Sequence, residues 1–164
     1  MLNNGLQYLL ELYAFENSTY TKKNSETISN TYAVNSLSLS YDYTTLLYTQ
    51  DSNIKIMKKN SSGIFVSNQI LTASETLYDS SISSDSSIVV ASSKLTLYYY
   101  FYNSATYQYD LKQSLTLEPN TANSNTKGIL DLSYDGSTLA YVTYKSKLNI
   151  AKLSSSLFSL NQTF

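Results

Sequence analysis

The sequence predicts an all-β protein made of repeated four-stranded antiparallel sheets. A Ser-x-Asp segment occurs three times, and its aspartates Asp42, Asp85 and Asp135 are 43 and 50 residues apart. Short β-prone runs also stand at matching distances from each aspartate, and each run is too short for a helix. Repeats of about 40–50 residues are typical of β-propeller blades. The chain is therefore predicted to be a partial propeller of about three and a half blades.

Each predicted strand has a counterpart in all three copies. Apolar residues lie three before and four after the aspartates, at Leu39, Ile82 and Leu132 and at Leu46, Val89 and Leu139. Apolar pairs with the period of a strand then follow at Ile54 and Ile56, Leu95 and Leu97, and Leu148 and Ile150. A fourth run surrounds Phe65, Tyr109 and Phe158, and a Gln recurs near its end at Gln69, Gln113 and Gln162. Four strands joined by short turns form one blade.

The Ser-x-Asp segments are predicted to be structural turns, at Ser40 and Asp42, Ser83 and Asp85, and Ser133 and Asp135. Asp135-Gly136 is a hairpin signal, because Gly adopts positive φ without strain and Asp hydrogen-bonds nearby backbone. Tyr43 and Ser86 stand in place of this Gly in the other copies. Those turns need either another geometry or a costly backbone conformation at Tyr43.

Over residues 33–164 the chain resembles the WD-repeat-like and Ser-x-Asp-Gly-type β-propeller superfamily. Residues 38–46 followed by residues 51–57 look like a WD repeat with Met57 in the place of the signature Trp, and residues 132–141 are similar to the Ser-x-Asp-Gly-type repeats. The resemblance implies a propeller architecture. It also implies a structural role for Asp51 as the turn aspartate between the second and third strands.

The whole chain, residues 1–164, is predicted to be a single propeller segment with blades at 33–72, 73–118 and 126–164. Residues 1–32 form either a partial blade or an N-terminal cap. Apolar residues fit a helix at Leu2, Leu6, Leu9, Leu10 and Tyr13, and a strand at Leu6, Tyr8, Leu10 and Leu12. The similarity between residues 15–20 and 101–107 favours strands, equivalent to the third and fourth strands of a blade.

An open arc of blades leaves its two end faces bare. Each face would be an apolar patch of the order of several hundred Å², more than soluble monomers usually expose. We therefore expect a homo-oligomer, a protein partner, or a place in a longer propeller. The predicted assembly surface consists of Leu6, Tyr8 and Leu10 at the start and Leu148, Ile150, Leu157 and Phe158 in the last blade.

Composition argues against catalysis and several kinds of ligand. The chain contains no His, Cys or Arg, so Ser-His-Asp and Cys-His arrangements and nitrogen or sulfur metal sites are excluded. We expect no catalytic residues, no cofactor and no metal. A net charge of −1 gives no long-range attraction to nucleic acid. No signal peptide or membrane span is predicted, and no compartment is indicated. Asn17, Asn60 and Asn161 match the glycosylation pattern.

Tyrosine is the residue type best suited to recognition, with 17 in the chain. Tyr98 to Tyr102 on a third strand alternate faces, so half of these rings should wedge between blades while the others look outward. The predicted function is a non-catalytic protein-interaction or structural module, a scaffold or a subunit of a larger assembly. The alternative is a part of an enzymatic or carbohydrate-binding propeller whose site residues lie outside this chain.

Overall fold

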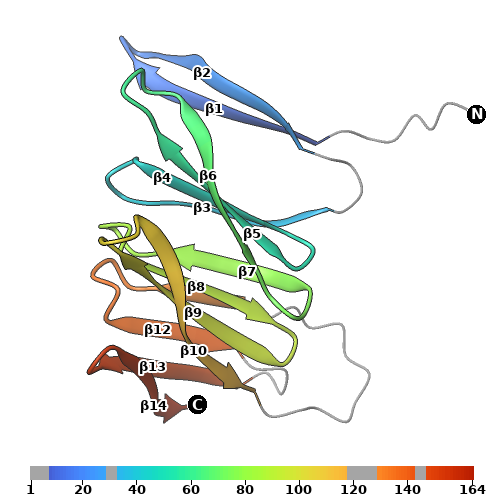
Figure 1. The fold of residues 1–164 in the computed structure, drawn as a ribbon, viewed down its shortest axis with the longest axis vertical. Helices are drawn as coiled ribbons and strands as arrows, with labels where there is room; N and C mark the ends of the chain where they lie inside the picture. The colour runs from blue at the N-terminus through green and yellow to red at the C-terminus, as the bar shows by residue number, and fades with distance from the viewer. Residues whose placement is uncertain (1–7, 29–32, 118–128, 143–146) are drawn as a thin grey trace, which may run out of the picture.

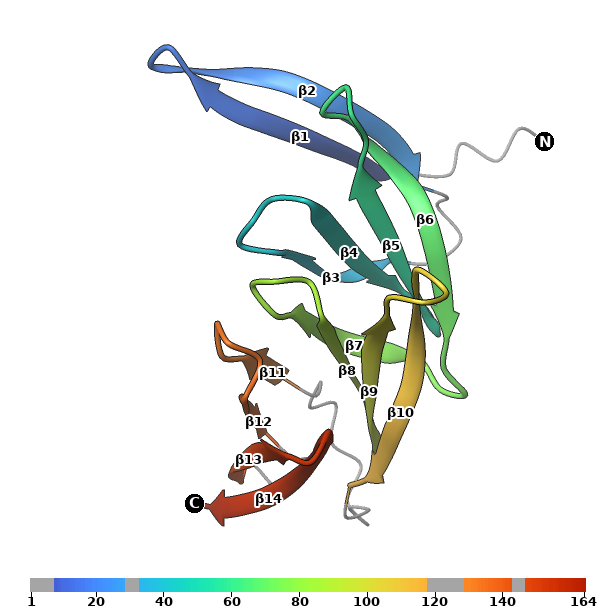
Figure 2. The same cartoon turned by 60° about the vertical axis from the view of Figure 1, so that its left-hand side comes forward.

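The computed structural model describes residues 8–28, 33–117, 129–142 and 147–164, and every regular element in these ranges is a β-strand. The strands form one two-stranded sheet and three four-stranded sheets. The sheets follow one another from the N-terminal hairpin to the last blade (Figure 1). Figure 2 shows that they fan out along a curve, with the first turn of each four-stranded sheet on the same side. Blades around an arc have this arrangement.

Each four-stranded sheet is an antiparallel meander whose strands pair in chain order. Blade 1 consists of β3 (Val34–Leu39), β4 (Thr45–Gln50), β5 (Asn53–Lys59) and β6 (Phe65–Thr72). Blade 2 consists of β7 (Leu77–Ile82), β8 (Ile88–Ser93), β9 (Thr96–Asn103) and β10 (Gln108–Thr116). Blade 3 consists of β11 (Ile129–Leu132), β12 (Thr138–Val142), β13 (Leu148–Ser154) and β14 (Leu157–Thr163).

The N-terminal unit is a hairpin of β1 (Tyr8–Glu16) and β2 (Thr19–Ile28). Asn17 and Ser18 join the strands with φ values of 50° and 63°, and two consecutive positive φ values suit the twist of a two-residue hairpin turn. Residues 8–28 therefore form a β-hairpin rather than a helix. Leu2, which belongs to the helical pattern, and Leu6, which belongs to both patterns, lie outside the described residues.

Blade 2 is packed on both faces because it lies between blades 1 and 3. Tyr98 and Tyr100 on β9 belong to the core shared with blade 1, whereas Tyr99 belongs to the core shared with blade 3. All three rings are buried. The prediction that half of these rings look outward is wrong, since side chains on either face of this sheet meet a neighbouring blade.

The hairpin covers the outer part of blade 1. Leu10 and Leu12 of β1 pack on Leu46, Tyr48 and Met57 of β4 and β5 in a third apolar cluster. The core is thus divided into three layers, one at each boundary between successive sheets. Each layer depends on apolar side chains from the two sheets that meet there.

Two tyrosines in these layers differ in how their hydroxyl groups are satisfied. The Tyr99 ring stacks on Phe158 with centroids 4.7 Å apart, and its buried hydroxyl has no hydrogen-bond partner among the described residues. Burial raises the pKa of Tyr99. The Tyr109 hydroxyl donates to the Ser86 carbonyl oxygen at 2.5 Å.

We predict opposite effects of removing these two hydroxyl groups. Tyr99→Phe should increase the free energy of unfolding by about 1 kcal/mol, because it deletes an unsatisfied buried polar atom. Tyr109→Phe should decrease it by about 1 kcal/mol, because the Ser86 carbonyl then loses its donor. Urea unfolding followed by circular dichroism measures both changes, and a destabilised Tyr99→Phe variant would contradict the assignment.

Candidate interaction surfaces

The first turn of every blade holds its Ser–Asp pair in the same geometry. The pairs are Ser40 with Asp42, Ser83 with Asp85 and Ser133 with Asp135. In each pair the serine Oγ donates to the aspartate Oδ1, at 2.6, 2.7 and 2.6 Å respectively. The serine Oγ also accepts the backbone N–H five residues on, and Oδ1 accepts the N–H two residues after the aspartate. These bonds satisfy backbone groups of each turn.

All three turns use a positive φ at the residue after the aspartate. The values are 56° at Tyr43, 61° at Ser86 and 70° at Gly136. Tyr43 therefore takes the costly conformation rather than another turn type, at a cost of the order of 1 kcal/mol. A Cβ on Gly136 would lie 2.9 Å from Ile88 Cδ1 of blade 2, so Gly also provides close contact between blades at this position.

Hydrogen bonds hold the turn aspartates in the ionised form. For Asp42 and Asp85, partial burial raises the pKa, but the bonds from serine, threonine and backbone donors outweigh burial and leave the pKa below its usual value. Asp135 lacks that burial, and the bonds from Ser133 and Ser137 lower its pKa to about 2. Each carboxylate therefore stabilises the folded state while it is ionised.

We predict that Asp42→Ala decreases the free energy of unfolding by about 1 kcal/mol at neutral pH through lost turn hydrogen bonds. Because the folded pKa lies below the unfolded value near 3.8, this contribution is complete above about pH 4 and is lost as the pH falls through the folded pKa. Urea unfolding of both proteins at several pH values measures it. A penalty that persists undiminished in strong acid would contradict the role of the ionised carboxylate.

Asp51 lies in the turn between β4 and β5, with a φ of 53°. Its carbonyl oxygen accepts the Leu77 N–H at 2.7 Å, and its side chain accepts a bond from Thr76 Oγ1 at 3.2 Å. These contacts join blade 1 to the segment that begins blade 2, so Asp51 has structural contacts here.

Exposed tyrosines gather on the rim formed by the Ser–Asp turns. Tyr41 meets Tyr134 of blade 3 edge to face with ring centroids 4.9 Å apart, and it stacks on Tyr43 at 6.2 Å. The Ser84 N–H of blade 2 donates to the Tyr134 carbonyl oxygen at 3.0 Å. The turns of all three blades therefore converge, and they present an aromatic surface to solvent.

An amide side chain links each outer strand to the next. Gln69 of β6 donates to the Tyr109 carbonyl oxygen at 3.0 Å and accepts the Tyr109 N–H at 2.8 Å. Gln113 of β10 makes the same two bonds to Phe158 of β14, at 3.0 and 2.9 Å. Asn24 of β2 donates to the Phe65 carbonyl oxygen at 2.9 Å. We call this contact the amide clamp.

The clamp follows a local sequence pattern in all four units. An aromatic residue stands four positions before each amide, at Tyr20 and Asn24, Phe65 and Gln69, Tyr109 and Gln113, and Phe158 and Gln162. Two such residues would share a face in a regular strand. The pairing register, however, skips one residue immediately before every amide, at Lys23, Asn68, Lys112 and Asn161. This β-bulge turns the amide toward the following blade, while the aromatic residue packs on the preceding one.

The recurring Gln was visible in the sequence, but its role was not. Asn24 and the aromatic partners were missed, since a bulge has no composition signal of its own. The spacing of four residues shared by the units was the signal available. It becomes informative only when the register of the strands is known.

The outward face of blade 3 is exposed, whereas the equivalent face of blade 2 is buried against blade 3. Leu148 on β13 is 41% exposed, whereas Leu97, at the equivalent position of β9, is 1% exposed. Ile150 is partly buried and Leu157 is exposed. Gln162 lies on the same face, opposite Ile150, and within the described ranges its amide has no hydrogen-bond partner.

Phe158 does not belong to this end face. Its ring is buried against Tyr99 of blade 2, and its backbone is held by Gln113. The prediction was wrong because Phe158 and Leu157 alternate across the strand. At the other end, Leu10 packs on blade 1, Tyr8 begins β1 opposite Ile28, and Leu6 lies outside the described residues.

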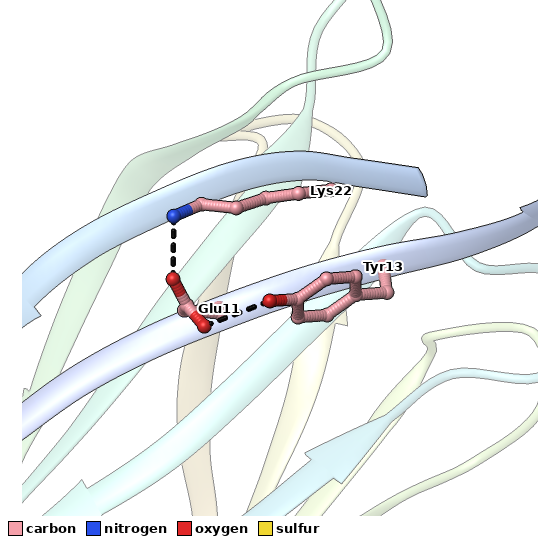
Figure 3. Close-up of polar contacts among 3 residues, drawn as sticks. All are labelled: Glu11, Tyr13 and Lys22. Atoms are coloured by element: carbon pink, nitrogen blue, oxygen red, sulfur yellow. Dashed lines mark hydrogen bonds and ion pairs between the residues drawn. The ribbon is translucent and has the colours of Figure 1, made fainter. Parts of the chain in front are cut away.

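The other face of the hairpin carries a polar network. Glu11 and Tyr13 alternate with Leu10 and Leu12 along β1 and so point away from blade 1. Lys22 Nζ lies 2.5 Å from one Glu11 oxygen, and the Tyr13 hydroxyl donates to the other at 2.9 Å (Figure 3). The Lys22 bond lowers the pKa of Glu11 and raises the pKa of Lys22. This face therefore combines a polar network with the exposed side chains of Leu9, Tyr13 and Tyr20.

Among the described residues, no group of three or more acidic side chains could hold a metal ion. The described ranges also include no helix of the length and apolarity that crossing a membrane requires.

Comparisons with solved structures identify the fold. A protein from Lactobacillus plantarum matches 94% of this chain with a TM-score of 0.73 and 13% identity, over 50% of its own length. A putative 6-phosphogluconolactonase from Bacteroides uniformis matches 96% with a TM-score of 0.71 and 13% identity, over 48% of its length. Saccharomyces cerevisiae Sqt1 matches 82% with a TM-score of 0.67 and 11% identity, over 36% of its length.

The fold is of the propeller type. The chain spans about half the length of the first two proteins. No protein-family model matches the sequence, and no curated protein matches it. At these identities the likeness establishes architecture, and function has to be argued from the surfaces of the molecule.

Proposed function

We propose that the chain is a non-catalytic interaction module, a propeller segment that associates with another β-sheet unit through the outward face of blade 3. This proposal rests on one observation: Gln162 stands at the position of the amide clamp, but its side chain has no hydrogen-bond partner among the described residues. Its two counterparts, Gln69 and Gln113, each bind a backbone N–H and C=O of the next outer strand. We also propose that the repeats are of the Ser-x-Asp-Gly type, on the strength of the shared turn geometry.

The apolar surroundings of Gln162 support the same surface. Leu148 and Ile150 lie where blade 2 has the buried Leu97 and Tyr99, and a blade packed on them would remove apolar area from water at about 25 cal/mol per Å². Contact with one further unit would complete the pattern that the first two blade boundaries already show.

A second copy of the chain offers a suitable partner. Its Tyr20 stands at the position of Phe65, Tyr109 and Phe158, the aromatic residues whose backbone receives the clamp. Tyr20 is 75% exposed, whereas these three counterparts are 2–8% exposed. The association is therefore head to tail, with blade 3 of one copy against the hairpin of the next.

We predict that the chain self-associates and that Gln162→Ala weakens its association about tenfold or more, since two hydrogen bonds of about 1 kcal/mol each are lost. Leu148→Glu should have a larger effect, because it places a charge in an apolar contact. Sedimentation equilibrium over a range of concentrations measures both.

Gln69→Ala is the matched control, because it removes the same two bonds inside the chain. It should decrease the free energy of unfolding by about 2 kcal/mol and leave the dissociation constant of the remaining folded protein unchanged. Two outcomes would overturn the proposal. The chain stays monomeric at high concentration, or it associates with a dissociation constant that neither Gln162→Ala nor Leu148→Glu changes.

The alternative function is a part of an enzymatic or carbohydrate-binding propeller. It is supported by the likeness to the Bacteroides uniformis protein, whose name denotes a lactonase. Against it stands the lack of His, Cys and Arg in this chain. The test is hydrolysis of 6-phosphogluconolactone by the purified chain. We expect no rate above the spontaneous one, and an enzymatic rate abolished by a single acidic substitution would favour the alternative.

A further inference from the structure

Strand β1 lies at the opposite end of the arc from Gln162, and one of its edges is unpaired among the described strands. In each four-stranded blade the third strand pairs on both sides, as β5 does with β4 and β6. The hairpin repeats the outer pair of a blade, with the same bulge before its amide. Among the described strands, however, β1 pairs only with β2. The other edge of β1 therefore presents backbone groups in the positions that pair with a second strand elsewhere.

Two leucines on β3 are exposed, and their exposure indicates a gap beside that edge of β1. Leu37 and Leu39 are 54% and 41% exposed. Residues at the same distances from the aspartates of the other blades are 5–7% exposed, namely Ser80, Ile82, Leu130 and Leu132. Those residues are covered by the first strand of the preceding blade, which is also linked to them by polar contacts such as Ser36 Oγ to Ser80 Oγ at 2.8 Å. No described strand covers Leu37 and Leu39 in this way.

A cavity of about 690 Å³ extends between the hairpin and blade 1. Leu12 of β1, Leu39 of β3 and Tyr43 of the first turn are among its lining residues. The cavity thus reaches from the hairpin to Leu39, one of the two exposed leucines. In the complete blades, two inner strands lie beside the strand that corresponds to β1.

We propose that this gap binds a two-stranded β-hairpin of a partner polypeptide. The second strand of the partner pairs antiparallel with β1, and its first strand covers Leu37 and Leu39. Main-chain hydrogen bonds to β1 supply affinity, and alternate side chains on the inner face supply specificity. Those side chains are apolar, because the surface they meet is Leu37 and Leu39. This binding site is separate from the blade 3 surface and does not depend on it.

The chain itself contains a suitable probe. Residues 77–93 form β7, β8 and their turn, and in the molecule this hairpin precedes and packs beside Leu130 and Leu132, which stand at the positions of Leu37 and Leu39. Isolated hairpins are marginally stable in water. The probe is therefore fused as a second copy ahead of residue 1 of the full chain, which gives it a high effective concentration at the gap.

The experiment compares this fusion with one that carries the same residues in scrambled order. Hydrogen exchange of the amides in residues 8–16 should slow at least about tenfold in the native-order fusion only, because the free edge of β1 becomes paired. The melting temperature should rise relative to the scrambled fusion. Leu37→Asp in the fusion should abolish both effects.

Ile70→Asp is the matched control, because Ile70 on β6 is 54% exposed like Leu37 but lies away from the gap. It should leave the slowed exchange intact. Equal exchange in the native-order and scrambled fusions, or slowing that survives Leu37→Asp, would overturn the proposal. If β1 of the unfused chain is already protected and loses protection on dilution, a second copy fills the gap, and the assignment to a partner hairpin is wrong.

Discussion

The packing of one β-sheet against the next is the interaction on which the rest of the structure depends. Each blade alternates its side chains between two faces, so it needs a neighbour on both sides to remove its apolar residues from water. Blade 2 has both neighbours, and the tyrosines of β9 are buried on either face. The same requirement is unmet at Leu148 and at Leu37, which are exposed because no described strand or blade covers them.

The bulge and the amide clamp fix the register of that packing. Apolar contact is non-directional and would tolerate sliding of one blade along another. Two hydrogen bonds from one Gln to a single backbone residue allow only one alignment of the outer strands. The Ser–Asp turns act on the inner side in a comparable way, because they give all three first turns the same shape and bring their tyrosines together. The blades are thus aligned with one another both at their outer strands and at their inner turns.

The sequence was sufficient for what depends on local spacing. The Ser–Asp turns were predictable because donor and acceptor lie two residues apart, and the strands followed from apolar offsets. The positive φ of Tyr43 remained open, since Tyr at that position is compatible with two turn types until the backbone is known. The features that depend on contacts between blades were not predicted from the sequence. Phe158 was assigned to the wrong face, and the role of Gln113 was hidden, because the clamp joins residues 45 positions apart through a bulge.

The two ends of the arc differ chemically, and this difference gives the proposed association a direction. The amide of Gln162 has the geometry to bind a backbone N–H and C=O at the start of an outer strand, which a second Gln162 cannot offer. A contact between two identical blade 3 faces would therefore leave the clamp unfilled. The hairpin provides the complementary position at Tyr20, and its Glu11–Lys22–Tyr13 network remains partly accessible to water when no unit is bound. Both ends expose apolar side chains, but the blade 3 end carries an amide placed to bind a backbone and the hairpin end carries an aromatic residue at the position that receives it, so the proposed association joins unlike ends.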